Sequence, residues 1–126
     1  MSVDKKMEKK VILVVEDDGI GRTLLKEMLK NKGIEIHFAK NGQEAIAFFS
    51  KNPVPNIVLM DIRLPDTTGI ELTKILIREY PHINIVAQTA YATPEVEEEC
   101  YSIGMKAFLT KPLRASAVER VLEKLL

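Results

Sequence analysis

The sequence predicts an α/β fold, a doubly wound sandwich of five βα units around one parallel five-stranded sheet. Short apolar runs rich in β-branched residues alternate with segments whose apolar residues recur at helical spacing, a pattern typical of parallel strands joined by helices. The apolar runs show no alternation of apolar and polar residues, so we expect both faces of the sheet to be buried. Because crossover connections are right-handed, helices then cover both faces.

Five strands are expected, at about residues 11–15, 34–39, 56–60, 83–88 and 106–110. The first helix follows the first strand, with Asp18 as its N-cap and Gly33 at a C-terminal cap position. The second helix begins at a capping-box-like sequence, Asn41 to Glu44. The apolar stripe of the first helix comprises Ile20, Leu24, Leu25, Met28 and Leu29.

The three remaining helices carry equally local signals. The third ends before Pro81. The fourth begins with Thr93 as its N-cap and Pro94 at its first helical position, and Gly104 stops it. The fifth shows apolar residues at helical spacing up to the end of the chain.

The composition predicts one domain in a reducing compartment. The 126 residues are 46% hydrophobic, enough for a sizeable core, and 18 basic side chains balance 18 acidic ones. This balance argues against nucleic-acid binding or membrane contact by this segment. A single cysteine excludes an intrachain disulfide, and no apolar run approaches the roughly 20 residues of a membrane span. Residues 1–9 are polar and lysine-rich, and we expect a disordered leader or linker there, followed by one domain over 10–126.

Polar side chains fall where the predicted strands end. Glu16 and Asp17 follow the first strand and Asp61 ends the third, while Thr89 and Lys111 come at the ends of the fourth and fifth. Because the carboxyl ends of parallel strands meet at one sheet edge, where such sheets bind ligands, we expect these side chains to lie together. Three acids, a hydroxyl and an ammonium predict a site for a divalent cation and a phosphoryl group.

Four short motifs in this order resemble the receiver domain of two-component response regulators, and the resemblance covers residues 10–126. It implies a flavodoxin-like sheet of order 2-1-3-4-5. The matching segments are Val14-Val15-Glu16-Asp17-Asp18, Met60-Asp61-Ile62-Arg63-Leu64-Pro65-Asp66 with Gly69, Gln88-Thr89-Ala90, and Lys111-Pro112.

The resemblance implies a metal site and a phosphoacceptor. Asp61 would accept the phosphoryl group, and Asp17 and Asp61 would bind Mg²⁺ directly. Glu16 would bind the ion through water, and the backbone carbonyl of Arg63 would complete the protein's ligands. The chemistry agrees, because clustered acids need a cation to stay ionised together and a carboxylate can attack phosphorus to form an acyl phosphate.

The resemblance also implies a switch. Thr89 would bind a phosphoryl oxygen, and Lys111, preceding a cis peptide bond to Pro112, would pair with the phosphoryl group or with Asp61. Movement of Thr89 would be coupled to Phe108 on the fifth strand, and so to the surface from the fourth to the fifth helix. The Tyr that often stands at this family position is absent.

Two further residues would control access of water to the phosphoryl group. They are Arg63, two residues after the phosphoacceptor, and Tyr91, two residues after Thr89. Both are large, and neither is a carboxylate or amide suited to orienting a water. Arg63 stacked on Tyr91, or in contact with the phosphoryl group, would shield the phosphorus further. We therefore expect a phosphoacceptor switch with slow self-dephosphorylation, and not an enzyme.

Some local patterns have simpler explanations. Gly19-Ile20-Gly21 hints at a dinucleotide-binding loop, but Leu24 stands at the position of the third glycine and the preceding acids would repel a pyrophosphate. Cys100 is expected in a helix core and not as a nucleophile. The isolated residues His37 and His82 are not expected to bind metal or relay phosphate.

Two other functions compete with the receiver hypothesis. A phosphohydrolase of the haloacid-dehalogenase type also uses Asp, Thr and Lys, but its nucleophile lies early, in an Asp-x-Asp motif, whereas Asp61 lies mid-chain and Arg63 occupies the place of the second acid. A cap domain is also missing. A pseudo-receiver, an interaction module that has lost phosphorylation, is disfavoured by the complete set of acids, Thr and Lys.

The expected partner is a sensor histidine kinase or a histidine phosphotransfer domain, and the expected state is a monomer or weak dimer. The segment Ile85 to Ala92 is similar to receivers of hybrid sensor histidine kinases, and the charged segment Asp4 to Lys10 suits a linker from an upstream kinase core. We therefore favour a hybrid-kinase receiver, with a single-domain response regulator as the alternative. The expected location is the cytoplasm, or the cytoplasmic part of a membrane-anchored kinase.

Overall fold

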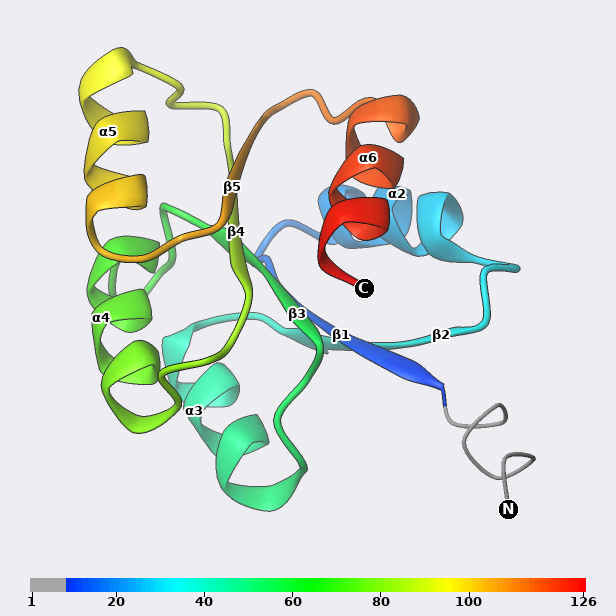
Figure 1. Ribbon diagram of the computed structural model, residues 1–126, viewed down its shortest axis with the longest axis horizontal. Coiled ribbons are helices and arrows are strands. Elements are labelled where there is room, and N and C mark those ends of the chain that lie inside the picture. Colours follow the sequence, from blue (N-terminus) through cyan, green and yellow to red (C-terminus); the bar gives the residue numbers. More distant parts are fainter. Residues whose placement is uncertain (1–8) are drawn as a thin grey trace.

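A parallel sheet forms the centre of the molecule. The computed structural model describes residues 9–126, so the predicted leader, apart from Lys9, lies outside the described residues. The strands are β1 (Lys10–Val15), β2 (Ile34–Ala39), β3 (Ile57–Asp61), β4 (Ile85–Thr89) and β5 (Ala107–Thr110). All neighbouring strands pair in parallel in the order β2-β1-β3-β4-β5, which confirms the predicted topology (Figure 1).

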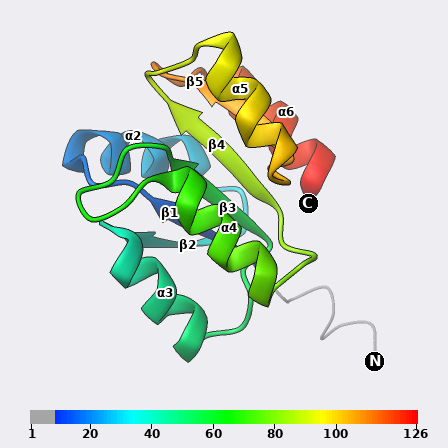
Figure 2. The same cartoon turned by 90° about the vertical axis from the view of Figure 1, so that its left-hand side faces the viewer.

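Helices cover both faces of this sheet. They are α2 (Gly19–Leu29), α3 (Gly42–Lys51), α4 (Gly69–Glu79), α5 (Pro94–Ser102) and α6 (Ala115–Leu125). Helices α2 and α6 lie on one face, and α3, α4 and α5 lie on the other (Figures 1 and 2). None of the helices within residues 9–126 combines the length and apolar character that a membrane crossing requires.

Alternate residues of each strand enter two separate cores. In β1, Leu13 and Val15 pack toward α3, α4 and α5, while Ile12 and Val14 pack toward α2 and α6. Both sets are fully buried. This double burial explains why the strands carry continuous apolar runs, as predicted. Cys100 of α5 is also fully buried in the first core, which confirms the prediction of a core residue, and burial raises the pKa of its thiol to about 11.

Side chains cap the helix N-termini at the predicted positions. The Asp18 carboxylate accepts a hydrogen bond from the Gly21 N–H, and the Thr93 hydroxyl accepts one from the Val96 N–H. At α3 the Asn41 side chain accepts a bond of 2.8 Å from the Glu44 N–H. These bonds satisfy N–H groups that have no partner within the helix.

Two predictions about the first helix are wrong. Helix α2 ends at Leu29 with Lys30 as its C-cap, so Gly33, whose φ is +69°, lies beyond the helix in the following turn. The predicted stripe is also only partly buried. Leu25 and Leu29 are fully buried, but Ile20 is 81% exposed and Leu24 is 42% exposed. The helix covers the sheet with the row of Leu25 and Leu29, and the adjacent row, rotated by about 100°, points away from it.

Candidate functional site

The sheet brings the predicted acids together at its carboxyl edge. Glu16 and Asp17 follow β1, and Asp61 is the last residue of β3, which pairs with β1. One carboxylate oxygen from each lies within 4.8 Å of the other two. Glu16 and Asp61 are buried, whereas Asp17 is exposed. The arrangement is therefore an acidic pocket with one side open to solvent.

Lys111 neutralises part of this charge. Its ammonium donates hydrogen bonds to Glu16 Oε1 at 2.5 Å and to Asp61 Oδ2 at 3.0 Å. The peptide bond between Lys111 and Pro112 is cis, as the resemblance implied. Partial burial acts to lower the pKa of Lys111, but the bonds to Glu16 and Asp61 outweigh it and raise this pKa. Burial raises the pKa of Glu16, against the opposing effect of its bond from Lys111.

Asp61 has both oxygens engaged. The residue is only 7% exposed, and the burial of a charge is costly unless partners compensate it. Lys111 bonds Oδ2, and the Arg63 backbone N–H donates to Oδ1 at 3.2 Å. These bonds hold the carboxylate in a defined position, from which one of its oxygens can attack an incoming electrophile.

The acidic pocket fits a Mg²⁺ ion by the chemistry of its donors. Carboxylate oxygens are ligands that this hard cation prefers, and it binds through one or two of them while keeping several waters. The exposed side at Asp17 leaves room for those waters. Of the predicted ligands, the structure brings Glu16, Asp17 and Asp61 together. The role of the Arg63 carbonyl stays a prediction.

Thr89 and Phe108 lie on the neighbouring strands. The Thr89 side chain is fully buried, and its hydroxyl accepts a hydrogen bond from the Tyr91 N–H at 3.0 Å. Phe108 pairs with Ala87 in the β4–β5 ladder and packs against the core shared with α3, α4 and α5. The two predicted switch residues therefore lie on paired strands, and their coupling stays a prediction.

The side chains of Arg63 and Tyr91 contact each other. The Arg63 guanidinium carbon lies 3.6 Å from the centroid of the Tyr91 ring, a cation–π contact. Of the two arrangements expected for Arg63, the stack on Tyr91 is therefore the one present, and its effect on the access of water stays a prediction. Tyr91 remains 48% exposed, so the pair is a surface feature.

Three residues around the site had no role assigned from the sequence, although Asp66 and Gln88 lie in the segments that carry the resemblance. Arg22 donates a bond of 2.9 Å to the Glu16 backbone carbonyl, and Asp66 accepts bonds from the N-terminus of α3. Gln88 is fully buried with neither side-chain polar atom hydrogen-bonded. Only Gln88 had a sequence signal, a polar residue inside an apolar run, and the other two contacts depend on how α2 and the loop after β3 are placed.

Known proteins are similar to this chain in sequence and in fold. The family model for the response regulator receiver domain matches residues 12–123. The chain is 37% identical over 126 residues to the osmosensing histidine protein kinase SLN1 of Saccharomyces cerevisiae, covering 94% of this chain and spanning only 10% of that kinase. It is 34% identical over 106 residues to the polar-differentiation response regulator DivK of Brucella anthropi, covering 82% of this chain and 85% of DivK.

Solved structures agree. Chemotaxis protein CheY4 of Vibrio cholerae superposes with a TM-score of 0.87 at 26% identity, covering 94% of this chain and all of CheY4. The receiver domain of sensor histidine kinase PA1611 from Pseudomonas aeruginosa superposes with a TM-score of 0.83 at 28% identity, covering 94% of this chain and 98% of that domain. That structure holds a magnesium ion in its active-site cleft. With the family model spanning most of its length, this chain belongs to the response regulator receiver domain family.

Proposed function

We propose that this domain takes a phosphoryl group from a phosphohistidine onto Asp61 and thereby switches a signalling surface. The donor is a sensor histidine kinase or a histidine phosphotransfer domain. The observation that carries the proposal is the Asp61 carboxylate, buried, held by Lys111 and within reach of two further acids. A carboxylate that accepts a phosphoryl group needs a nearby positive charge and a bound cation, so this function uses Asp61, Lys111 and the two further acids together.

In the transfer, an Asp61 oxygen forms a bond to phosphorus while the bond from phosphorus to the imidazole nitrogen breaks. The electron pair of the broken bond stays on that nitrogen. Asp17, Asp61, a water on Glu16 and the Arg63 carbonyl would hold Mg²⁺, which when bound would neutralise charge on the phosphoryl oxygens. Lys111, already beside Asp61, adds a second positive charge there, and Thr89 offers its hydroxyl to one phosphoryl oxygen.

Phosphorylation with a small donor tests the proposal directly. With acetyl phosphate and Mg²⁺, intact mass is expected to rise by one phosphoryl group in the wild type and not in Asp61→Asn. Asp18→Asn is the matched control, because Asp18 lies beside the acids but serves as the N-cap of α2, a role that Asn fills equally well. Equal labelling of Asp61→Asn and the wild type would remove Asp61 as the acceptor.

The switch would follow from the position of Thr89. A phosphoryl oxygen draws its hydroxyl away from the Tyr91 N–H, and Phe108 then fills the space left behind. The result is two discrete packings of the face formed by α5, β5 and α6.

The docking surface for the phosphodonor is proposed at α2. A phosphohistidine must reach Asp61 through the open side of the acidic pocket, so its carrier has to cover the residues beside Asp17. The exposed apolar side chains there are Ile20 and Leu24. Ile20→Glu is expected to slow transfer from a phosphorylated phosphotransfer domain by about tenfold or more, the loss typical of one buried interface anchor. Labelling by acetyl phosphate should not change.

Ile75→Glu is the control, because Ile75 is also an exposed apolar helix residue, 42% exposed against 81% for Ile20, and it lies on α4. The donor is the phosphotransfer domain that labels the wild type fastest. Equal transfer rates for the wild type and Ile20→Glu would place the docking surface elsewhere.

We propose a hybrid histidine kinase as the parent protein and a single-domain regulator as the alternative. Support comes from similarity to segments of proteins described as histidine kinases, against the similarity to DivK, most of whose length this chain covers. A kinase core encoded directly upstream would decide for the hybrid. The proposed location is the cytoplasm or the cytoplasmic part of such a kinase, and the proposed state, a monomer or weak dimer, is measured by sedimentation.

A further inference from the structure

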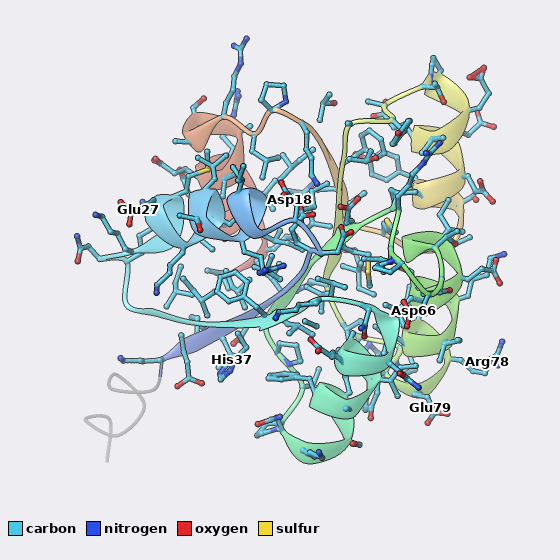
Figure 3. The ribbon with its side chains drawn as sticks, turned by 180° about the vertical axis from the view of Figure 1, so that it is seen from behind. Asp18, Glu27, His37, Asp66, Arg78 and Glu79 are labelled. Atoms are coloured by element: carbon cyan, nitrogen blue, oxygen red, sulfur yellow. The ribbon has the colours of Figure 1, made fainter. Side chains whose placement is uncertain are left out.

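The loop after the phosphoacceptor is tied to a helix that carries no part of the site. This loop, residues 62–68, joins β3 to α4. At its tip, Asp66 Oδ1 accepts a hydrogen bond from the Gly42 N–H at 2.9 Å, and Asp66 Oδ2 accepts one from the Gln43 N–H at 3.0 Å. Gly42 and Gln43 are the first two residues of α3, and Figure 3 shows Asp66 beside this end of the helix.

The electrostatics favour this contact. The N-terminus of a helix carries partial positive charge and unpaired N–H groups, so a carboxylate is stabilised there. The bonds from Gly42 and Gln43 accordingly lower the pKa of Asp66, so this group is ionised at neutral pH. Helix α3 also has its own cap at the next N–H, because Asn41 accepts from Glu44. Asp66 therefore adds a tether from a distant loop to a helix end that already has a local cap.

Packing reinforces the tether. A Cβ atom at Gly42 would lie 2.7 Å from Thr67 Cγ2, so Thr67 sits directly on the backbone of α3. A side chain at position 42 would require Thr67 to move. Thr67 can pack on α3 because Gly42 has no side chain, and Asp66 bonds to the same end of the helix. Both contacts hold the tip of the loop in one place.

The base of the loop carries Arg63, which contacts the phosphoacceptor Asp61. Leu64 N–H donates to the Thr67 carbonyl at 3.2 Å, and Arg63 forms a bridge with Thr68, so the tip and the base are one bonded turn. From this base, Arg63 donates its N–H to Asp61 Oδ1 and places its guanidinium over Tyr91. A shift of the tip is therefore transmitted to Arg63.

We propose that Asp66 is a positioning residue for the phosphoryl site, because its tether to α3 holds Arg63 against Asp61 and Tyr91. The tether and the contacts of Arg63 do not depend on the proposed function, but the effects on Mg²⁺ binding and on hydrolysis rest on it. Releasing the tether loosens Arg63, weakens Mg²⁺ binding through the Arg63 carbonyl, and uncovers the phosphorus to water.

The test compares Asp66→Ala with Asn41→Ala. Each variant removes a capping group from α3, so each lowers stability toward urea, but only Asp66→Ala frees the loop. In the wild type and both variants without Mg²⁺ or phosphate, NMR reports the Arg63 N–H and the Tyr91 ring. We expect both signals to shift in Asp66→Ala and to stay in Asn41→Ala. The Mg²⁺ dissociation constant, measured by titration of the same spectra, is expected to rise about 2- to 30-fold in Asp66→Ala alone, the range for coupling through a bonded segment.

Asp66→Asn keeps one acceptor oxygen and is expected to restore part of both effects, which also covers the case in which Asp66→Ala does not fold. Unchanged Arg63 and Tyr91 signals in Asp66→Ala would overturn the proposal, as would equal shifts in Asn41→Ala, because either result makes Asp66 a helix cap only. These spectra need no phosphoryl group. Failure of acetyl phosphate labelling would therefore count against the proposed function and leave the positioning role to be decided by the spectra.

Discussion

The Arg63–Tyr91 pair is expected to set the lifetime of the phosphorylated state. Hydrolysis requires a water in line with the bond from phosphorus to the Asp61 oxygen. The two side chains stack on each other, with 3.6 Å between the guanidinium carbon and the ring centroid. We expect the pair to cover that approach. The perturbation is the double change Arg63→Asn, Tyr91→Glu, which removes the stack and introduces groups that can orient a water.

The size of the effect follows from the exposure of the pair. Tyr91 is 48% exposed, and a cation–π contact at an exposed site contributes about 0.5–1 kcal/mol. If the stack must open before water enters, its loss raises the hydrolysis rate by about 2- to 5-fold. Either single change already breaks the stack, so each alone should give most of this factor. The double mutant should exceed it because the new side chains orient the water.

The assay follows intact mass after labelling with acetyl phosphate, removal of the donor and incubation in excess Mg²⁺. The control is Arg78→Asn, Tyr101→Glu, which makes the same chemical changes at exposed positions on α4 and α5. Its decay rate should equal that of the wild type. A double mutant at Arg63 and Tyr91 that decays at the wild-type rate or more slowly would refute the shielding argument, and Lys111 geometry would become the better explanation.

Three further predictions concern Gln88, Lys111 and the pair of Thr89 and Phe108. Gln88→Leu should raise the free energy of unfolding by about 1–3 kcal/mol in urea titrations, because it replaces a buried amide that has no hydrogen-bond partner, and a less stable variant would contradict this. The stability that Lys111 confers over Lys111→Met should be constant from neutral pH to pH 10.5, the ordinary pKa of lysine, and should be lost as the pH rises through the raised folded-state pKa. A difference that declines already between neutral pH and 10.5 would show that Lys111 acts otherwise. Beryllofluoride with Mg²⁺ should shift the NMR signals of Phe108 in the wild type and not in Thr89→Ala, and shifts confined to the acids in both proteins would argue against the coupling.

The sequence by itself determined the fold and most of the site. Continuous apolar runs require burial on both faces, and alternating helical segments then leave a parallel, doubly wound sheet as the solution. Since the carboxyl ends of parallel strands share one edge, Glu16, Asp17 and Asp61 were predicted together from their positions at strand ends alone, and they lie within 4.8 Å. The fold class and the gathering of the acids follow from local periodicity and from strand direction, and both can be inferred from a sequence.

Tertiary structure alone decided contacts that depend on packing angles and loop paths. The periodic stripe of α2 did not reveal that Ile20 and Leu24 face solvent, because periodicity gives the rows of a helix but not which row meets the sheet. Lys111 was expected beside the acids, but its bond to Glu16, across 95 positions of sequence, was not specified, and neither was the bond between Asp66 and Gly42, across 24. No local pattern encodes such distances, because each contact forms only after the sheet has brought distant segments to one edge and loop geometry has aimed a single side chain.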